Sequence, residues 1–163
     1  MRLDVAFTAD TVVPAQLRSA TVLVVDVLRA STTMITALGN GCAGLVPVAE
    51  PAEALARARA LGEGTLLAGE RGRVSLEDKV CAGLLVDRLA RDEPGAEVTE
   101  DARAALELGR GYGKAVARLA QDSSWARHLA LAGRGGDVAA CLVLDTTTLV
   151  PVLDVDKVVV GSR

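Results

Sequence analysis

The chain has 163 residues and a formal net charge of −3, and half of its residues are hydrophobic although only 2% are aromatic. A chain of this length can bury about 70% of the surface that its unfolded form exposes, which is enough for one domain with a core of Ala, Val and Leu. The acidic balance and the lack of a Lys/Arg run argue against a nucleic-acid partner. An anionic ligand would therefore need positive charge supplied locally, by particular arginines or a metal ion.

The cysteines and the apolar runs indicate the compartment. Cys42, Cys81 and Cys141 are far apart and lack the spacing of zinc ligands, so we expect free, mostly buried thiols of a reducing compartment. No apolar run approaches the length of a membrane span, and the segment Met1–Phe7 lacks the apolar core of a signal peptide. The sequence therefore predicts a cytoplasmic protein with no membrane partner.

Strand and helix patterns alternate in the first half of the chain, and helices dominate the second half. The expected strands are Leu3–Phe7, Thr21–Val25, Gly44–Val48, Gly64–Ala68, Leu149–Leu153 and Lys157–Val160. The expected helices are Ser31–Leu38, Pro51–Leu61, Ser75–Leu89, Thr99–Leu108, Lys114–Ala120 and Ser124–Leu131. The βαβαβ order implies parallel strands with crossover helices. We predict one α/β domain over residues 1–163, a three-layer α/β/α fold with a mostly parallel sheet and a helix-rich C-terminal half.

The first informative segment follows the expected strand at 21–25. Asp26 ends this apolar run, Arg29 comes next, and Ser31, Thr32 and Thr33 begin the following helix. Open α/β sheets bind ligands at the carboxyl ends of their strands, and the N–H groups of a helix start stabilise anions. A buried Asp–Arg pair with a hydroxyl helix cap would explain each residue alone. The crowding of all five in one turn favours a site for a phosphorylated or sulfonated ligand.

A second acid–arginine pair, Glu70 and Arg71, ends the expected strand at 64–68 and is followed by Ser75, Glu77 and Asp78 at a helix start. A capping-box-like helix start would explain Ser75 and Asp78, and acids in a first helical turn are usually solvated. Together with the aspartate of the first segment, however, four carboxylates follow strands or begin helices. Such oxygen ligands suit Mg²⁺, which commonly uses one or two carboxylates, waters and a substrate phosphate. The arginines of both segments would clamp the anionic oxygens.

Other motifs are better explained structurally. The GxGxxG match at Gly39–Gly44 follows a helix and precedes a strand, the reverse of a dinucleotide-binding fingerprint, so it predicts a helix C-cap and a tight turn. The glycine-rich stretches Gly109–Gly113 and Gly133–Gly136 lack a preceding strand and the Walker lysine, and we interpret them as turns. His128, the only histidine, has no recognisable nucleophile elbow to serve and is expected on a helix surface or at a helix end.

The two segments resemble the 2-phosphosulfolactate phosphatase (ComB) family. The similar stretches are collinear over nearly the whole chain: Asp26–Thr33, Asn40–Gly41, Val46–Val48, Ala68–Gly72, Ser75–Asp78, Ala82–Gly83, Asp137–Cys141, Asp145 and Val150–Val152. The resemblance implies a Mg²⁺-dependent enzyme that removes phosphate from 2-phospho-3-sulfolactate to give sulfolactate, a step towards coenzyme M. The expected partner is thus a small anionic phosphorylated substrate.

We assign the expected roles accordingly. The candidate catalytic residues are Asp26, Arg29, Glu70 and Arg71. The candidate substrate-binding residues are Ser31, Thr32, Thr33 and Gly72, and the candidate metal ligands are Asp26, Glu77 and Asp78. The Asp26 carboxylate would either coordinate the metal or attack phosphorus, since a carboxylate can form an acyl phosphate.

The chain departs from the family in its middle. Family members carry a long segment between the motif ending at Gly72 and the motif beginning at Ser75, where this chain has only Arg73 and Val74. The domain is thus expected to be internally shortened, and the rival hypothesis is a non-catalytic anion-binding or subunit-like protein lacking part of the active site. Removing strands would expose sheet edges and apolar surface, so we expect a homodimer.

Overall fold

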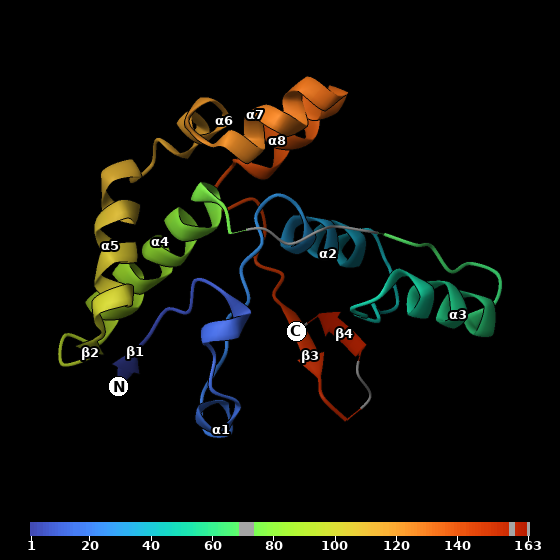
Figure 1. Cartoon of the computed structure of the whole chain (residues 1–163), viewed down its shortest axis with the longest axis horizontal. Coiled ribbons are helices and arrows are strands. Elements are labelled where there is room, and N and C mark those ends of the chain that lie inside the picture. The colour runs from blue at the N-terminus through green and yellow to red at the C-terminus, as the bar shows by residue number, and fades with distance from the viewer. Residues whose placement is uncertain (69–73, 157–158, 163) are drawn as a thin grey trace. The chain divides into compact units, whose positions relative to one another are not determined.

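The computed structural model describes residues 1–68, 74–156 and 159–162 (Figure 1). The chain divides into two compact units. The first unit comprises residues 1–31 and 73–146, and the second comprises residues 32–72 and 147–163.

The first unit is mainly helical. Its elements, in chain order, are β1 (Arg2–Leu3), a 3₁₀ turn (Ala9–Thr11), α1 (Pro14–Leu17), α4 (Leu76–Asp92), β2 (Glu97–Val98), α5 (Glu100–Tyr112), a second 3₁₀ turn (Val116–Arg118), α6 (Leu119–Asp122), α7 (Ser124–Leu129), a π-helical turn (Ala130–Arg134) and α8 (Gly135–Cys141). The π-helical turn contains Gly133 at a φ of 79°, a conformation that glycine adopts readily, and it separates α7 from α8.

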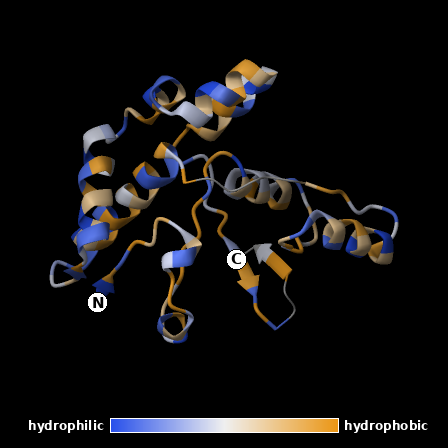
Figure 2. Cartoon of the chain, viewed as in Figure 1, coloured by the Kyte–Doolittle hydropathy of each residue, from blue (hydrophilic) through white to orange (hydrophobic). Residues whose placement is uncertain are grey.

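The longest two helices, α4 and α5, pack against each other through small residues. Both carry hydrophobic as well as hydrophilic positions along their length (Figure 2). Gly83 of α4 and Gly109 of α5 are buried, and a Cβ added at either position would overlap the backbone of the other helix. The absence of side chains at these two positions therefore permits backbone-to-backbone contact.

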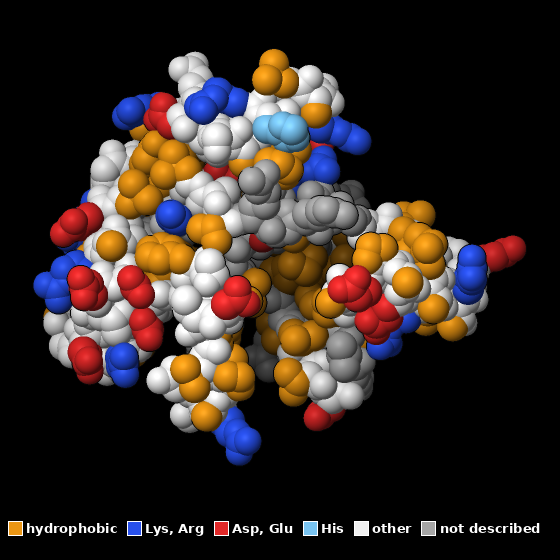
Figure 3. All heavy atoms as spheres, in the orientation of Figure 1, with side chains coloured by type: hydrophobic (Ala, Val, Ile, Leu, Met, Phe, Trp, Pro, Cys, Tyr) orange, Lys and Arg blue, Asp and Glu red, His pale blue; other side chains and the backbone are white. Residues whose placement is uncertain are grey.

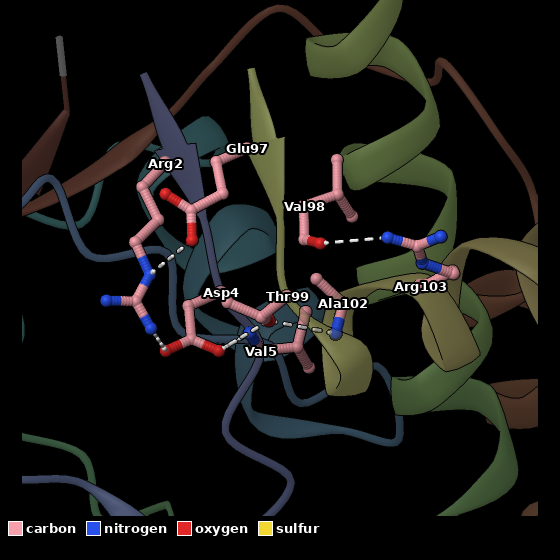
Figure 4. Close-up of polar contacts among 8 residues, drawn as sticks. All are labelled: Arg2, Asp4, Val5, Glu97, Val98, Thr99, Ala102 and Arg103. Atoms are coloured by element: carbon pink, nitrogen blue, oxygen red, sulfur yellow. Dashed lines mark hydrogen bonds and ion pairs between the residues drawn. The ribbon is translucent and has the colours of Figure 1, made fainter.

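Polar contacts join the two strands of the first unit and begin α5 (Figure 4). β1 and β2 pair in parallel, with Arg2 opposite Glu97. Thr99 is the N-cap of α5: its hydroxyl oxygen accepts from the backbone N–H of Ala102 at 3.3 Å and donates to the Asp4 carboxylate at 2.8 Å. An N-cap hydroxyl stabilises a helix start by about 1 kcal/mol, so Thr99 fixes both the helix boundary and its attachment to β1.

The first unit holds two hydrophobic clusters. The larger consists of Leu28, Val80, Val116, Leu119, Ala126, Leu129, Val138 and Leu142. The smaller consists of Leu3, Val86, Ala102 and Leu106. Leu28 is only 5% exposed, so its burial anchors the short loop between residues 26 and 31 against α4, α7 and α8.

The second unit contains two helices and an antiparallel hairpin. Its elements are α2 (Ala30–Gly39), α3 (Pro51–Leu61), β3 (Pro151–Asp154) and β4 (Val159–Ser162). The first two residues of α2 belong to the first unit, at the end of its 1–31 stretch. In the hairpin, Val152 lies opposite Gly161 and Leu153 lies opposite Val160. Leu45 forms an isolated antiparallel bridge to Val160, with backbone hydrogen bonds of 2.9 and 2.7 Å.

The helix predictions are largely confirmed. The expected helix Pro51–Leu61 coincides with α3, and the helices expected from Ser31, Ser75, Thr99 and Ser124 correspond to α2, α4, α5 and α7. The segment expected as a helix at 114–120 forms a 3₁₀ turn and the start of α6 instead. The C-terminal half is helix-rich, as predicted, and the chain mixes helices with small sheets.

The strand predictions need correction. The expected strands at 21–25 and 64–68 contain no regular strand. The expected strand Leu3–Phe7 shares only Leu3 with β1, and the expected strand Gly44–Val48 is reduced to the single bridge at Leu45. The described residues form two two-stranded sheets, one parallel and one antiparallel, and the expected three-layer arrangement around a mostly parallel sheet is not seen among them. A strand of a parallel sheet is covered on both faces. The side chain of Val24 is instead 80% exposed.

Expectations from composition can also be compared with the fold. Cys42 is an exposed free thiol, and Cys81 is a half-buried free thiol whose pKa is raised by burial and by the nearby Asp78 charge. Within residues 1–68, 74–156 and 159–162, no helix has both the length and the apolarity required to cross a bilayer.

Candidate functional site

The loop that precedes α2 is closed by reciprocal hydrogen bonds between its ends. Asp26 Oδ1 accepts from the backbone N–H of Ala30 at 3.1 Å. Ser31 Oγ accepts from the backbone N–H of Asp26 at 3.0 Å, and the N–H of Ser31 donates to the Asp26 carbonyl at 2.8 Å. Asp26 and Ser31 thus hold the loop through bonds to its backbone. The alternative explanation expected Asp26 to pair with Arg29, whereas Arg29 forms an ion pair with Asp137.

The start of α4 contacts this loop directly. The backbone N–H of Val27 donates to Asp78 Oδ1 at 2.8 Å across 51 residues of sequence. The Ser75 hydroxyl donates to Asp78 Oδ2 at 2.7 Å. Ser75 does occupy the N-cap position of α4, but its side chain makes no capping bond to the backbone, so the capping-box interpretation is wrong. Asp78 instead joins the helix start to the loop, and Ser75 donates to the second oxygen of the same carboxylate.

Asp78 lies in an environment that disfavours its charge. Burial raises its pKa above the usual aspartate value, the hydrogen bonds from Ser75 and Val27 oppose that rise, and the negative charges of Asp26 and Glu77 add to it. Like charges held near one another in a partly desolvated site are stabilised by a proton or a cation. The site is therefore suited to a positively charged partner.

Glu77 is the most unusual carboxylate in the site. It is 1% exposed, and neither of its carboxylate oxygens has a hydrogen-bond partner among the described residues. Burying an unpaired charge is costly unless it binds a cation or takes up a proton. Even so, no three Asp, Glu, His or Cys side chains of the described chain are grouped closely enough to hold a metal ion. Among the expected metal ligands, Asp26 and Glu77 both lie near enough to Asp78 for their charges to raise its pKa.

Arg29 forms an ion pair that the sequence did not indicate. Its Nη1 donates to Oδ2 of Asp137 on α8, and the two side chains are 22% and 40% exposed. Arg134 Nη1 lies 4.0 Å from the same oxygen. Asp137 lies in a stretch that resembles the family, and that resemblance is the one signal that could have identified it.

A cavity of about 320 Å³ lies beside the start of α4. It is lined by Val74, Ser75, Leu76, Ser124, Trp125 and His128. The indole N–H of Trp125 donates to the Leu28 carbonyl at 2.9 Å, which connects the cavity wall to the 26–31 loop. The Trp125 ring stacks on the imidazole of His128, with centroids 5.1 Å apart. His128 is exposed on α7, as predicted, and the histidine side chain appears on the molecular surface in Figure 3.

The remaining predicted site residues lie in the second unit or outside the described residues. Thr32 and Thr33 are half buried in the first turns of α2 and belong to the second unit. Glu70, Arg71 and Gly72 lie outside the described residues. The structure therefore brings together the 26–31 loop and the start of α4.

The 26–31 loop, the start of α4 and the Arg29–Asp137 pair thus lie in one part of the first unit, and a cavity lies beside the start of α4. Small-molecule sites commonly combine a cavity of about 300–1,000 Å³ with a few convergent polar groups.

Sequence comparison identifies the family. The model of the 2-phosphosulpholactate phosphatase family matches residues 6–73 and, in a second stretch, residues 66–156. The chain therefore belongs to the 2-phosphosulfolactate phosphatase family.

Curated relatives carry the same family name, each described as a probable 2-phosphosulfolactate phosphatase. The protein of Clostridium tetani (strain Massachusetts / E88) is 35% identical over 82 residues, covering 50% of this chain and 35% of the relative. The corresponding protein of Clostridium acetobutylicum is 36% identical over 77 residues, covering 47% and 33%. The one from Clostridium perfringens (strain 13 / Type A) is 36% identical over 80 residues, covering 47% and 32%. The chain thus spans about a third of the length of the curated relatives it matches.

Proposed function

We propose that this chain is a Mg²⁺-dependent phosphatase that hydrolyses 2-phospho-3-sulfolactate, or a similar small phosphorylated acid with a second anionic group, to sulfolactate and phosphate. The observation that carries the proposal is the hydrogen bond between Val27 N–H and Asp78, because it holds the Asp26–Ser31 loop against the acidic start of α4. The family membership and the printed names of the relatives support the choice of reaction. Free thiols and the lack of a spanning helix among the described residues accord with a cytoplasmic location.

The charges of the site suit such a substrate. The chain as a whole is acidic, with a net charge of −3, so a multiply charged anion needs local cations. Arg29 provides one at the end of the loop, and a guanidinium can bind two oxygens of a phosphate or sulfonate at once. Preorganised positive charge near the transferring group is the main contribution that proteins make to phosphoryl transfer.

The carboxylates fit a hard divalent cation. Asp26 and Asp78 are close enough for the charge of one to raise the pKa of the other, and Glu77 is a buried carboxylate without a hydrogen-bond partner among the described residues. Mg²⁺ commonly uses one or two carboxylates and completes its shell with waters and substrate oxygens, so Asp26 and Asp78 are the proposed ligands, with Glu77 as a third candidate. When bound, the ion would neutralise charge on the phosphate and polarise its P–O bonds.

Two routes remain open for Asp26. In the first, a carboxylate oxygen of Asp26 attacks phosphorus, the P–O bond to sulfolactate breaks as the acyl phosphate forms, and water then hydrolyses the acyl phosphate. In the second, water attacks phosphorus directly, the P–O bond to sulfolactate breaks, and the protons of that water pass to the phosphate and to the sulfolactate oxygen, while Asp26 acts only as a ligand. Ser31, Thr32 and Thr33 are proposed to donate hydrogen bonds to the substrate, and Glu70, Arg71 and Gly72 are proposed to complete the site.

The alternative function is anion binding without turnover, as a shortened or subunit-like member of the family. It is supported by the aligned stretches, which cover only about a third of each curated relative, and by the two overlapping stretches in which the family model matches. It is also supported by the exposed apolar side chains of Val22, Leu23 and Val24, 53%, 55% and 80% exposed. These favour association with a second copy, and a homodimer is the proposed assembly.

The test is phosphate release by the purified chain. We expect release from phosphosulfolactate, and more slowly from a generic phosphoester, in the presence of Mg²⁺ and none after chelation. Asp26→Asn should lower turnover by orders of magnitude while keeping the fold. The matched control is Asp92→Asn, which removes a carboxylate that pairs with Arg88 on the exposed end of α4. Phosphate binding without Mg²⁺-dependent release would contradict the phosphatase and support the alternative.

A further inference from the structure

We propose that Asp137 is a positioning residue that holds Arg29 in the orientation in which its guanidinium binds an anionic group of the ligand. This inference rests on the proposed function, because it assumes that Arg29 contacts the anion. Its first support is the ion pair itself, which joins α8 to the 26–31 loop across 108 residues of sequence.

The backbone beside Arg29 is fixed from the same part of the fold. The indole N–H of Trp125 on α7 donates to the carbonyl of Leu28 at 2.9 Å, and the Leu28 side chain is 5% exposed. Leu28 packs in one cluster with Leu129 of α7 and Val138 of α8. Helices α7 and α8 therefore hold the backbone beside Arg29, and Asp137 of α8 holds its side chain.

Two arginines approach the Asp137 carboxylate. Arg29 pairs with it directly, and Arg134 Nη1 lies 4.0 Å from the same oxygen. Asp137 therefore holds Arg29 within a small cluster of charged side chains on α8 and the 26–31 loop. Arg134 is 60% exposed and is the residue of this group with the greatest freedom to approach a second anionic substituent.

A purely structural ion pair would behave differently. Partly exposed pairs contribute about 0–1 kcal/mol to stability, so Asp137→Asn should leave the melting temperature nearly unchanged. A positioning role predicts a selective loss of Arg29 order and of anion affinity. Asp137→Glu keeps the charge and should retain both.

The experiment uses the full chain and inorganic phosphate as the probe. The Nε–Hε signal of Arg29, assigned by its disappearance in Arg29→Lys, reports the order of the side chain by ¹⁵N relaxation, and calorimetry reports phosphate affinity. We expect Asp137→Asn to mobilise Arg29 and weaken phosphate binding about tenfold, equivalent to about 1.4 kcal/mol. We expect Asp137→Glu and the control Asp92→Asn, which removes the exposed Arg88 pair, to resemble the wild type.

The outcomes separate this inference from the phosphatase proposal. An Asp137→Asn chain with an ordered Arg29 and unchanged phosphate affinity would overturn the positioning role. So would a wild-type chain that binds no phosphate, which would also remove the anion site from the proposed function. A wild-type chain that binds phosphate and loses that affinity in Asp137→Asn, yet turns over no ester, would support the positioning role while contradicting the phosphatase.

Discussion

Replacing Gly83 with alanine tests the close packing of α4 and α5. A Cβ at this position would overlap the carbonyl oxygen of Ala105 and lie 2.6 Å from its carbonyl carbon and 2.9 Å from the Gly109 nitrogen. These neighbours are backbone atoms of α5, so rotation of a side chain cannot relieve the overlap. The two helices have to move apart, and the apolar residues between them lose contact.

The size of the effect follows from two opposing contributions. Alanine is favoured over glycine inside a helix by about 1 kcal/mol. Overpacking costs about 1–3 kcal/mol, and more where rigid backbone is displaced. Because the neighbours are backbone atoms, we take the overpacking cost at the upper end of this range, about 3 kcal/mol, which leaves a net loss of about 2 kcal/mol. For a chain of this size about 2–4 °C accompanies each kcal/mol, so the melting temperature should fall by about 4–8 °C.

The control is Gly111→Ala in the same helix pair, where an added Cβ meets nothing within 4 Å. It should leave stability unchanged or raise it by up to about 1 kcal/mol, from helix propensity alone. Thermal melts followed by circular dichroism compare the three chains. The packing described for α4 and α5 is refuted if Gly83→Ala is as stable as Gly111→Ala.

Three further predictions concern stability and assembly. The hydrogen bond from Arg110, helped by the charge of Arg91, holds the pKa of Asp87 below its usual range. The stabilisation by Asp87 is therefore complete above the ordinary pKa of about 4 and is lost as pH falls through the lower folded-state value. In urea titrations Asp87→Asn should cost about 1 kcal/mol at pH 7 and nothing in strong acid, and a pH-independent difference would contradict this. Trp125→Phe leaves the Leu28 carbonyl without its indole donor, so it should lower the free energy of unfolding by about 1–3 kcal/mol, whereas an unchanged value would show that the bond is unimportant. Sedimentation velocity should show a homodimer, and a monomer at every concentration would count against the assembly.

Local sequence patterns predicted the helices well, because helices form from contacts between near neighbours. Helix α3 (Pro51–Leu61) begins with a proline and is followed by a glycine, and Thr99 caps α5. The strands were predicted less well, because a strand exists only when a distant segment pairs with it. The apolar run at 21–25 has β propensity, but the structure gives it no ladder, whereas β3 gains one from β4.

The candidate site shows the same division. Asp26 and Ser31 are neighbours in sequence, and their mutual contacts follow from the turn that they form. The approach of Asp78 to this turn was expected at the edge of a parallel sheet, yet it occurs through a hydrogen bond from Val27 to a helix start. Asp137 was not predicted as a site residue, because an ion pair across 108 residues leaves no local pattern.

The structural and functional explanations of the acidic residues can now be separated. Hydrogen bonds within the loop account for one oxygen of Asp26. Asp78 Oδ1 accepts the bond from the loop, and Oδ2 accepts a bond from Ser75 at the start of the same helix. No such account applies to Glu77, which is 1% exposed and has no hydrogen-bond partner among the described residues. A polar or apolar residue of similar size would avoid the desolvation of this carboxylate. Because residues that violate packing rules without compensation tend to mark functional sites, Glu77 favours a cation-dependent role for the first turn of α4.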